Sequence, residues 1–249
     1  MADQTLAQSG ALRKPGRGPR SRNQIVRKIE RGWNFASGWA WFRLTEPRRD
    51  LPDLVNFVLG DHFFAAMQVR SELHALGEIL AELQPRRALE IGTARGGTLL
   101  LLTRLANPQA TIVSVDLPGG EFGGGYSRTR RWFYQRFARR KQKLHLLQGD
   151  SHSQEMLGRV KSAFDGEPLD YLFIDGDHLY EGVKSDLEMY GPLVKKGGLI
   201  AFHDIVEGKP EFVGGVPRFW REIRSGYRHK EFIEDPQQGG YGIGVLYVE

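Results

Sequence analysis

The sequence contains no cysteine, no long apolar run and no apolar core near its amino terminus. Without cysteine, disulfide bonds, thiolate metal sites and cysteine nucleophiles are excluded. No run approaches the roughly 18 apolar residues that a membrane-spanning helix needs. The first residues also lack the apolar segment of a secretory signal. We therefore expect a cytoplasmic protein.

Little net charge remains once the amino-terminal segment is set aside. The 249 residues carry a formal net charge of +5. Residues 1–31 hold eight Lys and Arg against Asp3 and Glu30, a net of +6, so the remaining residues sum to −1. Rich in Gly, Pro, Ser, Gln and Arg, residues 1–24 are predicted to form a disordered basic tail. The near-neutral remainder argues against a core that binds nucleic acid.

Aromatic residues crowd the segment that follows the tail. Between residues 25 and 44 apolar side chains recur at helical spacing, which predicts a helical N-terminal extension or cap over residues 25–60. The aromatic residues between 25 and 44 are Trp33, Phe35, Trp39, Trp41 and Phe42. Such a helix docks on the main domain, covers the substrate or joins two copies in a homo-oligomer. Beside a basic tail it also fits peripheral contact with a membrane, and these interpretations stay open.

Residues 61–249 are predicted to form one domain. Helical spacing runs through residues 61–83, after which strands and helices alternate. The predicted strands are 87–91, 111–115, 143–147, 169–174, 198–202 and 243–248. The predicted helices are 96–106, 127–139, 152–163, 180–194 and 215–224. The pattern predicts an α/β, Rossmann-like, doubly wound fold with a mostly parallel sheet, helices on both faces and an antiparallel C-terminal edge strand.

The first predicted strand ends in Glu90 and turns through Gly92, Thr93 and Gly96. Glycine permits a tight turn and lets a ligand approach the bare backbone. The turn lacks the G-x-G-x-x-G spacing of a dinucleotide site, and a neighbouring carboxylate disfavours a pyrophosphate. A cationic ligand with an amino-acid end and ribose hydroxyls fits better. S-adenosylmethionine is such a ligand.

Polar residues also follow the next four predicted strands. In chain order they are Asp116, then Asp150 and Ser151, then Asp175, Asp177 and His178, and last His203 and Asp204. An acid about 20 positions beyond a glycine turn is placed to bind ribose hydroxyls. Taken singly, each acid also serves to cap a helix. Together they predict a cleft, because parallel strands end at one edge of a sheet.

Five motifs give the chain a resemblance to a known family. They are EIGTARGG, the acid in VSVDLPGG, QGDS, FIDGDHLYEGVKSDL and GGLIAFHD. In this order, residues from about 60 to 249 resemble class I S-adenosylmethionine-dependent methyltransferases. The branch is the one that includes small-molecule O-methyltransferases, cephalosporin-hydroxylase-like proteins and macrolide-sugar methyltransferases. The FIDGDH and GGLIAFHD pair is more specific for its metal-using members.

The resemblance implies which residues bind the cofactor. They are Glu90, Gly92, Thr93, Gly96, Asp116, Asp150, Ser151 and Asp175. By position, the glycine turn with Glu90 would hold the methionine end, and Asp116 would bind the ribose hydroxyls. Asp150 with Ser151 would face the adenine.

The resemblance also implies a divalent-metal site formed by Asp175, His203 and Asp204, with Mg²⁺ as the expected ion, and a general base, His178. His203 stands where relatives often carry an acid, and imidazole suits Mg²⁺ poorly. The cofactor carries the activated methyl group, so the protein must position and deprotonate the acceptor. A cation lowers the pKa of the acceptor hydroxyl and a histidine takes the proton. His178 as a helix cap and His203 as a structural residue remain alternatives.

Two further segments are predicted to shape the substrate site. The glycine-rich loop from Pro118 to Tyr126 is expected to close over the cofactor, with Phe122 and Tyr126 touching the ligand. The loop over residues 206–216 is expected to form a wall of the acceptor pocket. The helix after the first loop is basic and fits either an acidic partner or a solvated surface. Asp186 and Glu188 are expected on a solvated helix surface.

The function predicted from these features is S-adenosylmethionine-dependent O-methylation, assisted by a divalent metal. The acceptor is expected to be a small hydroxylated molecule, a sugar or a natural-product scaffold. One alternative is a nucleic-acid methyltransferase, which the basic segments favour. The chain lacks the Asn/Asp-Pro-Pro-aromatic motif of base-amine methylation after the fourth strand. Another alternative is a non-catalytic, membrane-tethered binding protein.

Overall fold

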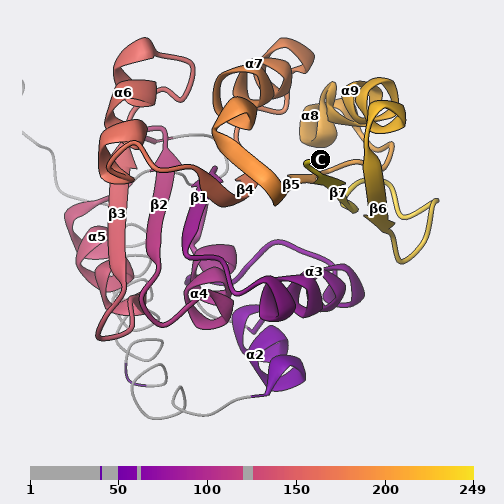
Figure 1. Cartoon of the computed structure of the whole chain (residues 1–249). Helices are drawn as coiled ribbons and strands as arrows, with labels where there is room; N and C mark the ends of the chain where they lie inside the picture. The colour runs from indigo at the N-terminus through magenta and orange to yellow at the C-terminus, as the bar shows by residue number, and fades with distance from the viewer. Residues whose placement is uncertain (1–39, 41–49, 61–62, 120–125) are drawn as a thin grey trace, which may run out of the picture.

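Figure 1 shows the computed structural model, which describes residue 40 and residues 50–60, 63–119 and 126–249. The predicted tail and the five aromatic residues between 25 and 44 lie outside the described residues. Phe122 of the glycine-rich loop lies outside them as well. Contacts of the extension with a membrane or a second copy therefore stay predictions. In the described part of the chain, no helix has the length and apolar character that crossing a membrane requires.

A seven-stranded sheet forms the centre of the molecule, in the order β3-β2-β1-β4-β5-β7-β6. The strands are β1 (Arg87–Ile91), β2 (Thr111–Asp116), β3 (Lys143–Gln148), β4 (Leu169–Ile174), β5 (Val194–His203), β6 (Arg228–Phe232) and β7 (Ile243–Tyr247). The first five are parallel, and β7 runs antiparallel to both β5 and β6. Strand order reverses between β1 and β4, which confirms the doubly wound α/β fold.

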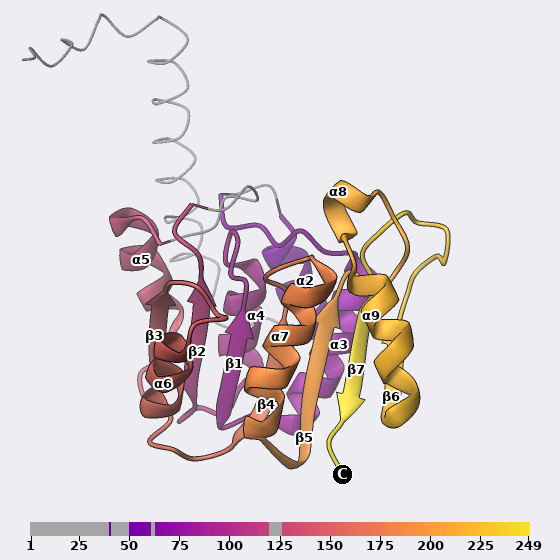
Figure 2. The ribbon, with the colours of Figure 1, turned by 90° about the horizontal axis from the view of Figure 1, so that it is seen from above.

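Helices cover both faces of the sheet (Figures 1 and 2). One face carries α2 (Leu51–Val58), α3 (Arg70–Leu83), α4 (Gly97–Leu105) and α5 (Arg128–Tyr134). The other carries α6 (Gln154–Ala163), α7 (Tyr180–Tyr190) and α9 (Val216–Ile223), with the short α8 (Pro210–Val213) beside them. All six residues of β4 are buried, as expected for a parallel strand covered on both sides.

Aromatic side chains join α2 to the rest of the first helical layer. The rings of Phe57 and Phe64 lie 6.0 Å apart, and Phe64 packs on Phe133 at 5.1 Å. Phe133 in turn packs edge-on against Phe137 at 5.1 Å. All four rings are buried, and each contributes about 1.5–3 kcal/mol by leaving water. Part of the predicted extension thus packs into the same core as the sheet.

Several predicted boundaries differ from the structure for local reasons. The predicted helix over 61–83 begins only at Arg70. The predicted helix over 180–194 ends at Tyr190, and a short 3-10 turn containing Pro192 follows it. Proline lacks the amide hydrogen that would continue the helix. Strand β5 then starts at Val194, four residues earlier than predicted.

Strand β6 is absent from the sequence prediction. Its residues, RHKEF, are mostly exposed and show no buried face of alternating apolar side chains. It pairs with β7 along its whole length and takes the outermost position in the sheet. The antiparallel strand β7 is present as predicted, one place inside this edge.

Candidate functional site

The glycine turn after β1 packs directly against the chain that leaves β4. Gly92 has φ +89°, and a Cβ added there would lie 1.9 Å from the carbonyl oxygen of Asp175. The amide of Asp175 donates to the carbonyl of Ile91 at 2.8 Å. Gly96, with φ +92°, approaches the ring of Tyr134 in the same way, at 2.8 Å from a virtual Cβ. Both positions require glycine for packing and backbone shape.

Glu90 lies beneath this turn and is only 1% exposed. Its carboxylate accepts hydrogen bonds from Thr98 Oγ1 at 2.7 Å and from Ser114 Oγ at 2.8 Å. Burial raises the pKa of Glu90 to about 8, and the two hydroxyl hydrogen bonds limit this rise. Glu90 is therefore an inward-facing acid that fixes the shape of the turn.

A hydroxyl network continues from Glu90 toward the glycine-rich loop. Thr93, 2% exposed, shares hydrogen bonds with Ser114 and with the Tyr126 hydroxyl, the latter at 2.7 Å. The Tyr126 hydroxyl also donates to Ser114 at 3.0 Å. Tyr126 is 5% exposed and belongs to this buried network, and its predicted contact with the ligand stays a prediction. It ties the end of the loop to β1 and β2.

The acids after β2 and β3 lie on neighbouring strand ends. The half-buried Asp116 accepts a hydrogen bond at its backbone oxygen from the amide of Gly149, at 3.0 Å. Asp150 is exposed, and its Oδ1 accepts from the amide of His152 at 2.9 Å. Ser151 receives a hydrogen bond at its backbone oxygen from the Tyr190 hydroxyl, at 2.6 Å. The structure thus brings these acids to one edge of the sheet.

Two acids and two histidines meet at the ends of β4 and β5. His203 Nδ1 lies 3.1 Å from Asp175 Oδ1 and 3.3 Å from Asp204 Oδ2. His178 Nε2 lies 3.8 Å from Asp175 Oδ1 and 3.6 Å from Asp204 Oδ2. Each imidazole therefore faces both carboxylates.

Electrostatics hold both imidazoles in the charged form. Burial lowers the pKa of His178, but contact with Asp175 and the charge of Asp204 outweigh it and raise that pKa to about 9. The same balance raises the pKa of the buried His203 well above its ordinary value. Burial alone would raise the pKa of Asp175, but the charges of His203 and His178 hold it below its ordinary value. The cluster is a site where positive charge is strongly favoured.

The donor set fits a divalent cation. Ligand atoms of Asp175, His178 and Asp204 all lie within 4.8 Å of one another. His203 Nδ1 reaches the same two carboxylates, while its buried Nε2 has no hydrogen-bond partner among the described residues. Two carboxylates with one imidazole suit Mn²⁺, Zn²⁺ or Fe²⁺ better than Mg²⁺, which prefers oxygen ligands. The structure thus brings His178 into the group of possible ligands, and the predicted set with His203 stays a prediction.

Asp204 is held by a segment that the sequence analysis did not connect to it. It has φ +59°, a conformation costly for most residues but tolerated by Asp. Its Oδ1 accepts from the amide of Tyr241 at 3.1 Å. The next amide, of Gly242, donates at 2.9 Å to Glu72, an acid of α3 that is 1% exposed. The separation of 170 residues between these two partners hides this contact from local sequence patterns.

One of the two acids predicted on a solvated helix surface lies elsewhere. Asp186 is completely buried, whereas the side chain of Glu188 is 66% exposed. The prediction for Asp186 is therefore wrong. The carboxylate of Asp186 packs beneath the chain after β4, because its Oδ2 lies 3.6 Å from a virtual Cβ on Gly176.

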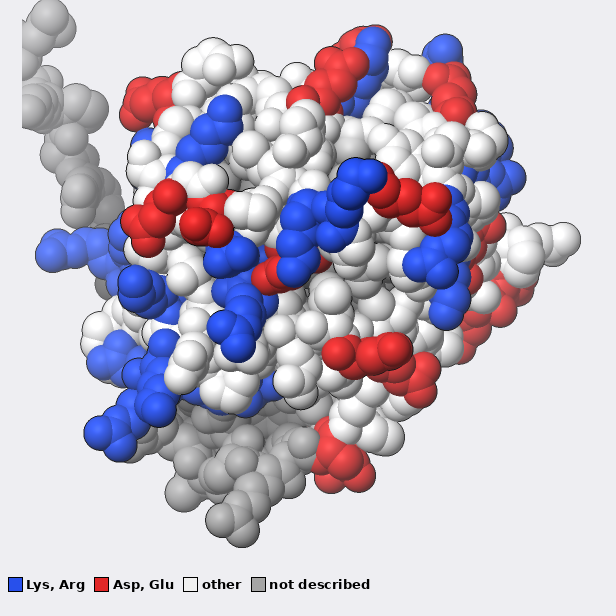
Figure 3. All heavy atoms as spheres, in the orientation of Figure 1, with Lys and Arg blue, Asp and Glu red and all other residues white. Residues whose placement is uncertain are grey.

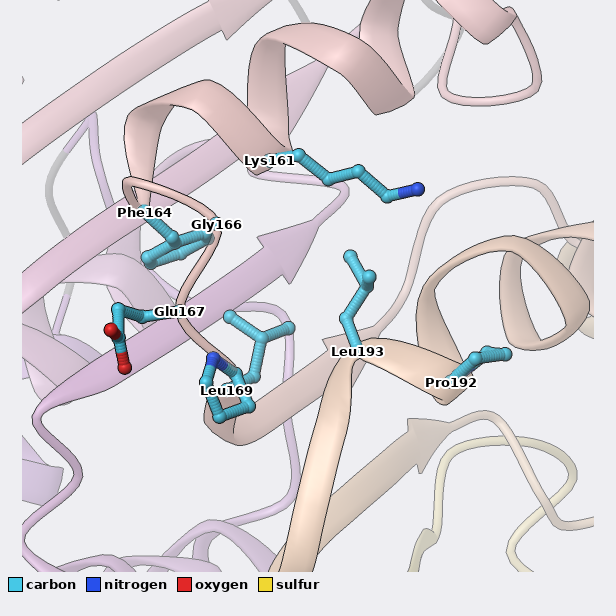
Figure 4. A pocket seen from close by; sticks show the side chains of 8 residues that line it. Lys161, Phe164, Gly166, Glu167, Leu169, Pro192 and Leu193 are labelled. Atoms are coloured by element: carbon cyan, nitrogen blue, oxygen red, sulfur yellow. The ribbon is translucent and has the colours of Figure 1, made fainter.

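Two surface features lie outside the strand-end cluster. A hollow of about 150 Å³ opens at the start of β4, lined by Lys161, Phe164, Glu167, Leu169 and Leu193 (Figure 4). It lies at the opposite edge of the sheet from the cluster. Figure 3 shows Lys and Arg gathered on the side of the molecule where α5 and β3 lie. The segment 127–143, which contains α5, is rich in basic residues: Arg128, Arg130, Arg131, Arg136, Arg139, Arg140, Lys141 and Lys143.

Comparison with known proteins agrees with the fold and the motifs. Residues 89–205 match the family model of a methyltransferase domain. Catechol O-methyltransferase B of Danio rerio is 30% identical over 174 residues, which are 67% of this chain and 62% of that protein. The chain thus spans less than two thirds of the length of this relative.

Solved structures share the fold at low sequence identity. An O-methyltransferase from Bacillus cereus in complex with SAH has a TM-score of 0.56 at 19% identity, covering 87% of this chain and 99% of that one. TomG of Streptomyces achromogenes, an O-methyltransferase of tomaymycin synthesis in complex with SAM, has a TM-score of 0.52 at 16% identity, covering 88% and 99%.

The doubly wound sheet is thus the fold of these O-methyltransferase structures. Residues 89–205 match a methyltransferase domain, and the chain is similar in sequence to an O-methyltransferase, in agreement with the resemblance that its motifs carry.

Proposed function

We propose that this protein is an O-methyltransferase that transfers the methyl group of S-adenosylmethionine to a hydroxyl of a small molecule. The observation that carries the proposal is the cluster of Asp175, His178, His203 and Asp204, which lies next to the glycine turn. The fold supports the cofactor class, and the cluster supplies groups that activate a hydroxyl. O-methyltransferases among the relatives support the reaction type.

The cofactor would lie along the ends of β1, β2 and β3. The glycine turn above Glu90 and Thr93 would hold the methionine end, with Gly96 leading into α4. Asp116 would bind the ribose hydroxyls, and the segment of Asp150 and Ser151 would face the adenine. This order follows the sheet, since β3, β2 and β1 are neighbours.

Asp175, His203 and Asp204 would hold a divalent cation, and Mg²⁺ is the first ion to test. Bound there, the cation would supply positive charge that lowers the pKa of an acceptor hydroxyl. The cation would replace the positive charges of His203 and His178, which hold the pKa of Asp175 low when no cation is bound.

His178 would act as the general base. Its Nδ1 contacts the backbone carbonyl of Phe212, which can only accept a hydrogen bond. The neutral ring therefore carries its proton on Nδ1 and presents the Nε2 lone pair to the cluster. Asp175 and Asp204 raise the pKa of His178. A cation bound to these two carboxylates would neutralise their charge and lower the pKa of His178 toward the range of a general base.

Apolar side chains beside the cluster favour an acceptor with an apolar ring or scaffold. Leu179 follows His178 and is 68% exposed, and Phe212, whose carbonyl contacts His178, is 52% exposed. The ring of Tyr241 lies 6.0 Å from that of His203 and is 41% exposed. These three side chains would contact the acceptor body, which fits a natural-product scaffold better than a bare sugar.

The test measures cofactor binding and methyl transfer together. The full chain is titrated calorimetrically with S-adenosylhomocysteine, with and without Mg²⁺. Methyl transfer from labelled S-adenosylmethionine is then followed on a panel of aromatic, polyketide and sugar hydroxyls. We expect binding, and turnover that EDTA abolishes and a divalent cation restores.

Matched variants decide the role of the cluster. Asp204→Asn should lower turnover and cation affinity, whereas Glu207→Gln, an exposed acid three residues away, should leave both unchanged. RNA is added to the panel as a control. Failure to bind S-adenosylhomocysteine, or methyl transfer to RNA and to none of the small molecules, contradicts the proposal. EDTA-resistant turnover contradicts its metal component.

A further inference from the structure

A buried carboxylate in the middle of α7 has no role in the function proposed above. Asp186 is completely buried, and among the described residues neither of its oxygens has a hydrogen-bond partner. Burying an unpaired carboxylate costs free energy, and a positively charged group nearby reduces that cost. His152 supplies it, because its Nε2 lies 3.3 Å from Asp186 Oδ1. Their alignment falls short of a hydrogen bond, so the contact is an ion pair.

His152 belongs to the segment that the proposed function assigns to adenine. Its amide donates to Asp150 Oδ1, and its Nδ1 lies 3.8 Å from the same atom. The ring thus stands between Asp150 on one side and Asp186 on the other. Asp150 is exposed at the rim, and Asp186 lies in the core beneath it.

A second contact from the same helix face reaches the same segment. Tyr190 follows Asp186 by four residues, which places both side chains on one face of α7. The Tyr190 hydroxyl donates to the backbone oxygen of Ser151 at 2.6 Å. Helix α7 therefore holds residues 151 and 152 from below at two adjacent points.

The raised pKa of His152 keeps its ring protonated at neutral pH, so the ion pair with Asp186 is present there. Asp186 raises the pKa of His152 to about 9, although partial burial opposes this change. Asp150 of its own segment and Asp177 after β4 add to the rise. The charged groups named here, one from α7, one from the loop of His152 itself and one from the loop after β4, are all acidic.

We propose that Asp186 is a positioning residue which, through His152, holds Asp150 and Ser151 in the conformation that binds the adenosyl end of the cofactor. The inference rests on the proposed function, since it concerns the same cofactor site. Asp186 touches no cofactor itself and acts only through the ion pair. Its loss should therefore affect cofactor affinity and leave the acceptor side of the site unchanged.

The test compares Asp186→Asn with Glu188→Gln, which removes an exposed acid from the same helix. Affinities for S-adenosylhomocysteine and for 5′-methylthioadenosine are measured by calorimetry on the full chain. The second probe carries the adenosyl end without the amino-acid end. Asp186→Asn should weaken both by a similar factor of about ten, the loss of one charged contact. Glu188→Gln should bind both like the wild type.

Two readouts separate positioning from general stability. The KM for S-adenosylmethionine should rise in Asp186→Asn while kcat and the KM of the acceptor stay within about twofold. The pKa of His152, followed by NMR, should fall toward its ordinary value in this variant. The affinity ratio between wild type and variant for 5′-methylthioadenosine should then shrink toward one as the pH rises above about 9, where the wild-type pair is lost.

Each outcome decides the inference. Equal affinity of Asp186→Asn and wild type, with a lowered pKa of His152, overturns it. Equal losses in kcat and in both KM values mean a purely structural role and also overturn it. Should the variant not fold, the wild type decides, because its affinity for 5′-methylthioadenosine must fall as His152 loses its proton. A wild type that binds neither probe removes the proposed function as well.

Discussion

Replacing Glu72 by Ala tests how the loop over residues 233–242 is held beside the strand-end cluster. The Glu72 carboxylate accepts from the amide of Gly242 at 2.9 Å, from the side-chain amide of Gln238 at 2.7 Å and from the amide of Glu234 at 3.2 Å. One buried acid of α3 therefore fixes three points of a loop that carries Tyr241.

The change in the free energy of unfolding depends on which hydrogen-bond donors Glu72→Ala leaves without an acceptor. Gly242 is buried, so its orphaned amide costs about 1–3 kcal/mol. Glu234 is exposed and Gln238 is half-buried, so their donors turn to water and cost less, about 0.5–1 kcal/mol each. Removing a buried carboxylate also relieves its desolvation, which offsets part of the loss. We expect a net destabilisation of about 2 kcal/mol.

The assay is urea and thermal unfolding followed by circular dichroism. At about 2–4 °C per kcal/mol for a chain of this size, Glu72→Ala should lower Tm by about 4–8 °C. Glu78→Ala on the same helix is the control, because that side chain is 65% exposed and lies 3.7 Å from His74. It should change the free energy of unfolding by less than about 0.5 kcal/mol.

A second measurement connects this loop to the cluster. Because the Tyr241 amide holds Asp204 Oδ1, a loosened loop should also weaken binding of Mn²⁺ or Mg²⁺ by the folded variant. A Glu72→Ala protein as stable as the control refutes the anchoring role. A destabilised variant with unchanged cation affinity refutes the connection to Asp204.

Four other predictions concern the cofactor and acceptor sites. His178→Ala should lower kcat about 10²–10⁴-fold with S-adenosylhomocysteine affinity nearly intact, and full activity would exclude it as the base. Asp116→Ala should weaken S-adenosylhomocysteine binding by about 1–3 kcal/mol in calorimetry, and unchanged binding contradicts its ribose role. Gly92→Ala should cost about 3 kcal/mol or more in urea unfolding, because φ is +89° and the Cβ would meet the Asp175 carbonyl; wild-type stability would mean the turn relaxes. The folded pKa of Glu90, about 8, exceeds its ordinary 4.5, so its contribution to stability is complete below about pH 4.5 and is lost as the pH rises to 8. Relative to Glu90→Gln, the wild type should therefore lose more than about 1 kcal/mol between pH 5 and 9, and parallel pH profiles refute this.

Local sequence patterns predicted the strands and helices in which apolar side chains recur at regular spacing. The inner strands are short apolar runs such as β4, and the sequence places a polar residue directly after each. The carboxyl ends of parallel strands lie at one edge of the sheet, so the sequence alone predicts that Asp175 and Asp204 lie close together. Strand β6 could not be found this way, since an exposed strand such as RHKEF carries no apolar alternation.

Contacts between distant segments explain what the sequence missed. Glu72 bonds to backbone amides of residues that lie more than 160 positions away, and such bonds leave no side-chain pattern. Asp186 looks like a surface acid because its helix neighbours Lys184 and Glu188 are charged. Its burial depends on where the loops after β3 and β4 cross α7, and this depends on tertiary packing.

The backbone at Asp204 limits how this position can change during evolution. A φ of +59° is reached cheaply only by Gly, Asn and Asp, so Glu or His would strain the backbone even though both can bind metals. Asn keeps the left-handed turn and an oxygen donor but drops the charge. We therefore expect related sequences to carry Asp, Asn or Gly at this position. In a descendant that loses the proposed cation site, we expect Asn or Gly at this position.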